Sequence, residues 1–167
     1  MSGIQQWQHF HTFKQRGEWV ELQFMAAASL RGYRVLKPWG DSLEYDLCVE
    51  HHSQFLRVQV KAFSSRRGGG YYCRLRHGGS GAQRYHPADL DLFALFILPA
   101  EAWYLIPSAH VLVPTPKMSL RLYPDGPPRP GRHTLAHDYE RYREAWGLLG
   151  KTREELSNST WERTRKV

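Results

Sequence analysis

The strictest pattern in this sequence is an alternation of apolar and polar side chains that runs from Phe55 to Phe63. One face of the run carries Leu56, Val58, Val60 and Ala62, and the other carries Arg57, Gln59, Lys61 and Phe63. Successive residues of a β-strand point to opposite faces, so this period of two predicts a half-buried strand. A second strand-like run, residues 43–50, precedes it across the polar residues 51–54. Two such runs around a short polar turn predict a β-hairpin.

The polar face of this hairpin carries a candidate metal-binding and catalytic site. Asp46 lies beside Gln59 and Lys61 if the register of the two strands puts it on the polar face. A carboxylate, an amide oxygen and an amine on rigid strands suit the binding of a hard cation next to a positioned water molecule, as in metal-dependent phosphodiester hydrolases. The same three residues also fit an ordinary surface strand with a polar outer face, which is common in antiparallel sheets.

Residues 17–30 are predicted to form a helix that packs on the sheet. Its first turn contains Glu18 and Glu21, where the helix macrodipole favours acidic side chains, and Gly32 is placed to end it. The predicted apolar stripe consists of Val20, Phe24, Ala27 and Leu30. Glu21 lies at the edge of this stripe rather than opposite it, so its carboxylate needs a partner. The helix dipole accounts for Glu18 better than for Glu21, and we therefore expect Glu21 to be functional.

The composition indicates one folded domain with an anionic partner. At 167 residues, 41% of them hydrophobic, the chain is long enough for a core that needs no disulfides. The formal net charge of +7 favours nucleic acid, although charge alone does not decide the partner. Cys48 and Cys73 form no CxxC pair or zinc-type cluster, which indicates a reduced, zinc-free protein. Without an apolar run of about 18 residues or a signal peptide, the sequence predicts a soluble cytoplasmic protein that does not bind membranes.

Five arginines beyond the hairpin are candidate DNA contacts: Arg66, Arg67, Arg74, Arg76 and Arg84. The first two lie in a glycine-rich loop, residues 64–70, and the next two share one face of a predicted strand, residues 71–76. Flexible glycines with arginines resemble a DNA-contacting hairpin more than a phosphate-binding loop of the Walker type, because no Gly-Lys-Ser/Thr follows. A solvated surface turn is the alternative.

The remaining segments predict more strands and a C-terminal helix. Residues 92–98 are nearly all apolar, as in a strand buried on both faces, and residues 103–106 follow as the next strand. We interpret Asp89 and Asp91, just before them, as turn residues rather than ligands. The proline-rich residues 114–132 predict a linker with little regular structure. Residues 138–149 predict a helix with the aromatic stripe Tyr139, Tyr142, Trp146 and Leu149, which covers either the chain's own core or a neighbouring subunit.

The order and spacing of these motifs resemble the PD-(D/E)XK nuclease superfamily. The features that carry the resemblance are Glu21 before Gly32-Tyr33, the Tyr45-Asp46-Leu47 step and the Arg57-Val58-Gln59-Val60-Lys61 strand. They are most similar to the group I intron-associated homing endonuclease branch, whose members have Tyr-Asp-Leu and Gln-Xaa-Lys in this arrangement. The segments around residues 91–94 and 104–107 also resemble the last core strands of that family. The resemblance implies an α/β, restriction-endonuclease-like core with a mixed central β-sheet flanked by helices.

The resemblance also implies roles for individual residues. Asp46 matches the metal-binding aspartate, although Tyr45 replaces the proline that gives the motif its first letter. Gln59 stands where most members have an acid, and the backbone carbonyl of Val60 where the family often has another metal ligand. Lys61 matches the catalytic lysine, and Glu21 matches the helix carboxylate that completes the metal shell, often through water. The implied cofactor is Mg²⁺, with Mn²⁺ as a substitute.

We therefore expect a Mg²⁺-dependent endonuclease that hydrolyses double-stranded DNA as a homo-oligomer, a dimer or tetramer, because cutting both strands needs two active sites. Three alternatives stay open: a restriction or junction-resolving enzyme of the same superfamily, a non-catalytic nucleic-acid-binding module that keeps the fold, and a structural or interaction protein. The expected segments are an N-terminal arm or short helix (1–16), the nuclease core (17–112), a proline-rich linker (113–137), and a C-terminal helix with a basic tail (138–167).

Overall fold

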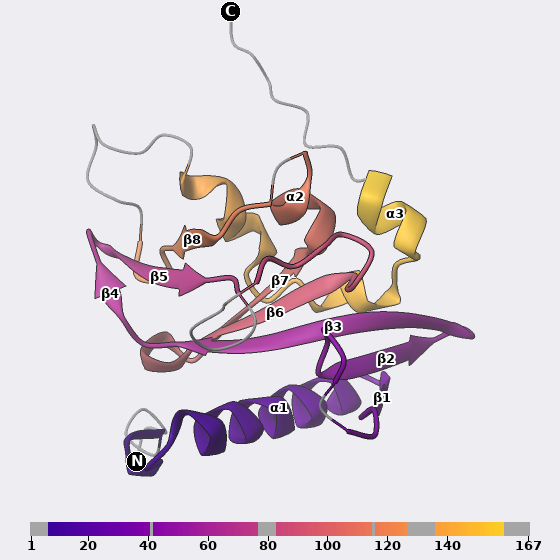
Figure 1. Ribbon diagram of the computed structural model, residues 1–167, viewed down its shortest axis with the longest axis horizontal. Coiled ribbons are helices and arrows are strands. Elements are labelled where there is room, and N and C mark those ends of the chain that lie inside the picture. The colour runs from indigo at the N-terminus through magenta and orange to yellow at the C-terminus, as the bar shows by residue number, and fades with distance from the viewer. Residues whose placement is uncertain (1–6, 41, 77–82, 115, 127–135, 159–167) are drawn as a thin grey trace, which may run out of the picture.

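The alternating run forms β3 (Gln54–Phe63), the middle strand of a five-stranded sheet. The structure is a computed structural model and describes residues 7–40, 42–76, 83–114, 116–126 and 136–158. The strands of the sheet are, in spatial order, β1 (Arg34–Leu36), β2 (Leu47–His51), β3, β6 (Leu92–Ile97) and β7 (Ala102–Pro107). β3 pairs antiparallel with β2 and parallel with β6. The predicted hairpin and the mixed sheet flanked by helices are both confirmed (Figure 1).

Both faces of this sheet are covered, which differs from the half-exposed sheet that the alternation predicts. The helix α1 (Phe13–Leu30) runs along one face (Figure 1) and contributes to a hydrophobic cluster that includes Val58 of β3. A second cluster, with residues of β5, β6, β7 and β8, fills the opposite face. Alternation turns Gln59 toward this second layer, and only 8% of its surface is exposed. The polar face of β3 is therefore largely shielded from water.

The helix α1 begins earlier than predicted. Its N-cap is Thr12, whose side-chain oxygen accepts a hydrogen bond from the Gln15 backbone N–H at 3.1 Å. Glu18 and Glu21 therefore lie beyond the first turn, and the dipole argument for them was wrong. The helix buries Val20, Phe24 and Ala28. Leu30 is 87% exposed, against prediction, because two further residues turn its side chain roughly 200° away from Ala28. Gly32, with φ 86°, follows the end of the helix as predicted.

A second sheet lies over the other face and consists of β4 (Arg66–Arg67), β5 (Gly70–Arg74) and β8 (Ser119–Leu122). β8 lies inside the segment that was predicted to be a linker with little regular structure, so that prediction was wrong for residues 119–122. The prolines of that segment flank this stretch without interrupting it, and Leu120 and Leu122 alternate with polar residues. Pairing with β5 buries both leucines in the second cluster.

Residues 138–149 do not form the single helix that was predicted. They lie in two 3₁₀ segments, η3 (Ala136–Tyr142) and η4 (Trp146–Gly150). Glu144, with φ 51°, turns the chain between them. Its backbone N–H donates to the Trp103 carbonyl at 2.8 Å, and its carboxylate accepts from the Trp103 N–H at 2.8 Å, which covers part of the open edge of β7. The two tyrosines of the stripe join the second cluster and the tryptophan joins the first, so the stripe covers the chain's own core.

Asp91 connects the start of β6 to β3 and to the C-terminal segment. Its Oδ2 accepts from the Arg57 backbone N–H at 2.8 Å, and its Oδ1 accepts from Arg57 Nη2 at 3.0 Å. Arg153 Nε lies 3.3 Å from Asp91 Oδ2 and belongs to α3 (Arg153–Asn158), a helix within the predicted basic tail. The rest of that tail, residues 159–167, lies outside the described residues. The remaining helical segments are η2 (Leu98–Ala100) and α2 (Ser108–Leu112).

Replacing Asp91 by alanine should destabilise the fold strongly. The carboxylate is only 9% exposed, and its loss leaves the Arg57 N–H without its acceptor and the guanidinium groups of Arg57 and Arg153 without their carboxylate. We expect the free energy of unfolding to fall by about 3 kcal/mol in urea denaturation. Asp89→Ala is the matched control, because its carboxylate accepts from the His86 N–H in an exposed turn, and it should cost about 1 kcal/mol or less. Equal losses in the two variants would contradict this role of Asp91.

Candidate active site

Asp46 lies immediately before β2, where the pairing of β2 with β3 places it beside Gln59. Leu47 is paired with Val58, and the Asp46 N–H donates to the Val58 carbonyl at 3.0 Å. The carboxylate then faces the next stretch of β3: its Oδ2 accepts from the Val60 N–H at 2.9 Å and from Gln59 Nε2 at 2.6 Å. The conditional prediction that Asp46 lies beside Gln59 is confirmed.

Lys61 follows two residues after Gln59 on the same face of β3, as the alternation predicts. Its Nζ lies 5.4 Å from the centroid of the Tyr85 ring, within the range of a cation–π interaction. Burial lowers the pKa of the Lys61 amine, and the nearby negative charge of Asp46 acts in the opposite direction. A lysine whose pKa is lowered in this way donates and accepts protons more readily near neutral pH than an exposed lysine does.

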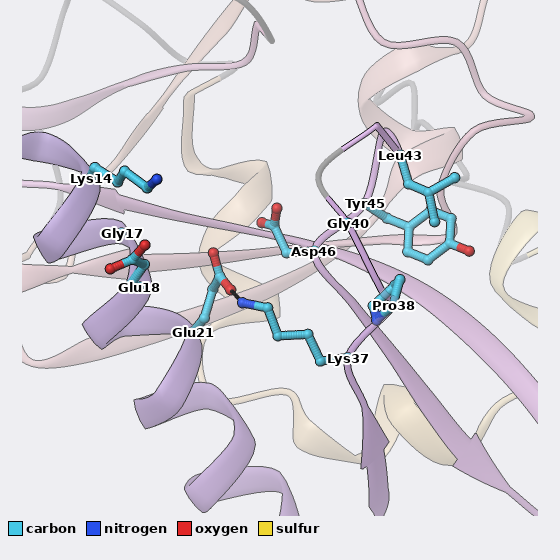
Figure 2. Close-up of a pocket in the computed structure, with 10 residues that line it drawn as sticks. All are labelled: Lys14, Gly17, Glu18, Glu21, Lys37, Pro38, Gly40, Leu43, Tyr45 and Asp46. Atoms are coloured by element: carbon cyan, nitrogen blue, oxygen red, sulfur yellow. Dashed lines mark hydrogen bonds and ion pairs between the residues drawn. The ribbon is translucent and has the colours of Figure 1, made fainter.

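Glu21 reaches the same region from α1, and there it meets a residue that we did not identify from the sequence. The Lys37 ammonium donates a hydrogen bond to Glu21 Oε2, and Figure 2 shows the two side chains meeting next to Asp46. This hydrogen bond is the main cause that raises the pKa of Lys37. The sequence has no local signal for this contact, which follows from the pairing of β1 with β2. Leu36 faces Cys48 in this antiparallel pair, so the next residue after β1 comes close to Asp46.

These groups lie around a cleft of about 450 Å³ between α1 and the start of β2 (Figure 2). The lining residues are Lys14, Gly17, Glu18, Glu21, Lys37, Pro38, Gly40, Leu43, Tyr45 and Asp46. The cleft therefore contains three carboxylates and two ammonium groups. The predicted residues Gln59 and Lys61 are not part of this lining, and they reach the cleft only through their interactions with Asp46.

The Asp46 carboxyl group has an unusual proton affinity. Burial, the largest cause, raises its pKa from 3.8 to about 6, and the negative charge of Glu21 contributes in the same direction. The Val60 N–H and the positive charges of Lys61 and Lys37 oppose this rise. A shifted carboxyl group next to a second carboxylate in a cleft is typical of functional sites, because ordinary surface carboxylates lack both causes.

The donor set of this cleft fits a hard divalent cation. Glu21 and Asp46 line it with carboxylate oxygens, and the Val60 carbonyl lies behind Asp46, where it accepts from Gln59 Nε2 at 3.3 Å. Mg²⁺ prefers such oxygen ligands. Asp46 Oδ1 accepts no hydrogen bond from any residue that the structure describes, so it is available as a ligand. Within the described ranges, no group of three or more His, Cys, Asp and Glu side chains is placed to hold a metal. Any cation here would therefore depend on the neutral oxygens and on water.

The arginines that were predicted to contact DNA lie away from this lining. Arg66 pairs with Asp125 at 3.3 Å, and Arg67 lies over the Tyr72 ring, with its guanidinium carbon 5.7 Å from the ring centroid. The other three are exposed: Arg74, Arg76 and Arg84. The first three belong to β4 and β5, and the other two follow β5 in the chain. DNA contact by these five arginines stays a prediction.

The mixed sheet, the helix on one face and the Asp46, Gln59 and Lys61 arrangement define a restriction-endonuclease-like fold. The family model of the PD-(D/E)XK endonucleases matches residues 11–142, and the chain belongs to this family. The chain is also similar to the solved structure of a bacterial homing endonuclease, I-Ssp6803I, with a TM-score of 0.69 and 26% sequence identity. That match covers 83% of this chain and 93% of the other. No curated protein sequence matches the chain significantly.

The family and the structural neighbour confirm the resemblance seen in the sequence and support nuclease function. PD-(D/E)XK nucleases typically use divalent metals, which agrees with the oxygen donors of the cleft. None of the helices within the described ranges is both long enough and apolar enough to span a membrane.

The raised pKa of Asp46 predicts a stability change with pH in protein kept in EDTA. The folded state binds this proton more tightly than the unfolded state, whose pKa is the ordinary 3.8, so wild type loses stability as the pH rises from about 4 to about 6. Asp46→Asn keeps an oxygen for the Val60 N–H but has no charge to bury. We expect the difference in free energy of unfolding, Asp46→Asn minus wild type, to increase across this window by up to about 2 kcal/mol, with the full increase reached above pH 6.

Urea denaturation of both proteins at a series of pH values measures this difference. A difference between the two proteins that stays constant over the window would show that the Asp46 charge is not its cause.

Proposed function

We propose that this protein is a Mg²⁺-dependent endonuclease that hydrolyses phosphodiester bonds of double-stranded DNA, similar in action to homing endonucleases, with Mn²⁺ as a substitute cofactor. The observation that carries the proposal is the Asp46 carboxylate, held on one oxygen by the Val60 N–H and the Gln59 amide and facing Glu21 in a cleft of the PD-(D/E)XK fold. The net charge of +7 agrees with a polyanionic substrate.

In this proposal, the cation is held by Asp46, by the amide oxygen of Gln59 and the carbonyl of Val60, and by Glu21 directly or through water. When bound, it supplies positive charge that offsets the negative charge developing on the phosphate oxygens during hydrolysis. For Gln59 to act as a ligand, its side-chain amide turns its oxygen toward the site, because its nitrogen now donates to Asp46. A glutamine adds no negative charge, so Asp46 and Glu21 provide all the acidic ligands.

Lys61 has the second role in the proposal. Its amine orients the attacking water and accepts a proton from it, and burial favours this because it lowers the pKa of the amine. The negative charge of Asp46 opposes this lowering of the Lys61 pKa. The backbone of β3 is fixed between β2 and β6, so Lys61 and Gln59 are held in a constant relation to Asp46.

A homo-oligomer completes the proposed function, because the described residues form one candidate site and a double-strand cut needs two. A two-fold dimer, or a tetramer built from such dimers, presents two sites to the two strands. Restriction enzymes and junction-resolving enzymes of the same superfamily remain alternatives, and cleavage of a branched junction rather than a long linear site would distinguish them.

Substitutions of Asp46 and Lys61 test the catalytic proposal. Asp46→Ala and Lys61→Ala should each lower the rate of plasmid cleavage with Mg²⁺ by about 10²- to 10³-fold, because each removes a charged group from the reacting region. Glu18→Ala is the matched control, since this carboxylate lines the same cleft but has no proposed role. The rates are compared at equal DNA occupancy, with EDTA reactions in parallel.

Cleavage that persists in EDTA, or in both substituted proteins, would contradict the proposal. Tight DNA binding by wild type without cleavage of a library of randomised targets would favour the alternative of a non-catalytic nucleic-acid-binding module.

Two exposed arginines, Arg74 at the end of β5 and Arg76 just after it, make a separate prediction about DNA affinity. Arg74→Ala and Arg76→Ala should each weaken binding to all sequences and lower the slope of log K against log salt concentration by about 1, because each loses one phosphate contact. Arg34→Ala is the control: this arginine of β1 is also exposed, but it lies 3.8 Å from Glu50. Fluorescence anisotropy at several salt concentrations measures the slopes, and equal slopes in all four proteins would contradict DNA contact at Arg74 and Arg76.

A further inference from the structure

The ion pair between Lys37 and Glu21 has no counterpart in the roles that the resemblance implies. It joins two elements, α1 and the end of β1, that are 16 residues apart in the sequence. The Glu21 side chain is 17% exposed and the Lys37 side chain 54% exposed, so a shielded carboxylate is neutralised by an amine that still reaches solvent. Figure 2 shows Lys37 extending across the floor of the cleft to Glu21, with Asp46 beside them.

The charges around Lys37 make it the counter-ion of the acidic part of the cleft. Its ammonium contacts Glu21, and its positive charge also acts on Asp46. Lys14 lines the same cleft from the first turn of α1 but makes no ion pair with any described residue. Of these two lysines, only Lys37 therefore occupies a carboxylate oxygen that a cation would use.

We propose that Lys37 and a divalent cation compete for Glu21, and that Lys37, once released, binds a phosphate of the nucleic acid. This inference rests on the proposed function, because it takes the cleft to be the metal site. Competition follows from electrostatics: an ammonium in contact with Glu21 repels a cation that approaches the same oxygen. A half-exposed lysine ion pair is weak, so a cation that also contacts Asp46 can displace it.

After release from Glu21, the Lys37 side chain can bind a phosphate in the same cleft. Lysine carries a compact charge on a flexible four-carbon stem and binds phosphate as a point charge. Lys37 lines the cleft and its side chain is 54% exposed, so its ammonium has room to turn from Glu21 toward a phosphate bound there. Cation and nucleic acid then bind cooperatively, since the cation frees a positive group that the nucleic acid uses, and the coupling is reciprocal.

Metal binding without DNA gives the first test. Isothermal titration with Mn²⁺ alone should show Lys37→Met binding the cation roughly three- to tenfold tighter than wild type. Lys14→Met removes one positive charge from the same cleft without releasing Glu21 and should change the affinity less than about twofold. Lys37→Arg should remain within about twofold of wild type, because it restores the ion pair. Misfolding would weaken Mn²⁺ binding, so tighter binding by Lys37→Met can be attributed to the loss of the lysine.

A double-mutant cycle shows whether Lys37 acts through Glu21. In a Glu21→Gln background, Lys37→Met should tighten Mn²⁺ binding by less than about twofold, because the competition for that carboxylate is gone and only the loss of one nearby positive charge remains. An equal gain in both backgrounds, or no gain in Lys37→Met while wild type binds Mn²⁺, would overturn the inference. Wild type that binds no Mn²⁺ at all would overturn the proposed metal site itself, so the two failures are distinguishable.

DNA affinity gives the second test. A mixed-sequence duplex is titrated by anisotropy with Ca²⁺ and with EDTA, and gels confirm that it stays uncut. The affinity in Ca²⁺ divided by the affinity in EDTA should be at least about three times as large for wild type as for Lys37→Met. Lys14→Met should keep the wild-type ratio. Equal ratios in wild type and Lys37→Met would overturn the proposed phosphate contact.

Discussion

The candidate site depends on the antiparallel pairing of β2 with β3. This pairing places Asp46 opposite Gln59 and leaves the Val60 N–H free to donate to the Asp46 carboxylate. A shift of one residue would turn Gln59 and Lys61 to the face that packs on α1, and would bring Val58 and Val60 to the polar side. Burial of those valines under α1 therefore stabilises the register, and this register places Asp46 beside Gln59.

The second layer of the fold changes the chemistry of the polar face of β3. Tyr85 and the second hydrophobic cluster shield this face, so Lys61 and Gln59 are not surface groups. Burial lowers the pKa of Lys61 and raises that of Asp46, which moves both groups toward neutral pH, where proton transfer is most effective. If the sheet were covered only by α1, the same three residues would be solvated and would lack these pKa shifts.

Gln59 limits the negative charge directly around Asp46, at the candidate metal site. With an acid at that position, three carboxylates would repel one another around Asp46, whose pKa is already raised. The glutamine removes one of those charges, and Lys37 neutralises Glu21. The lining of the cleft has three carboxylates and two lysine ammonium groups, and in our proposal Lys37 adjusts the affinity for a cation.

Local patterns were enough to predict the hairpin, the buried strand β6 and, given the strand register, the neighbourhood of Asp46, Gln59 and Lys61. These depend on alternation and short turns, which are local patterns. The tertiary structure decided that residues 119–122 join β5, that residues 138–149 divide around the edge of β7, that Leu30 faces solvent, and that Lys37 meets Glu21. Each of these depends on which distant segments pack together, and a local pattern carries no information about the partner it meets.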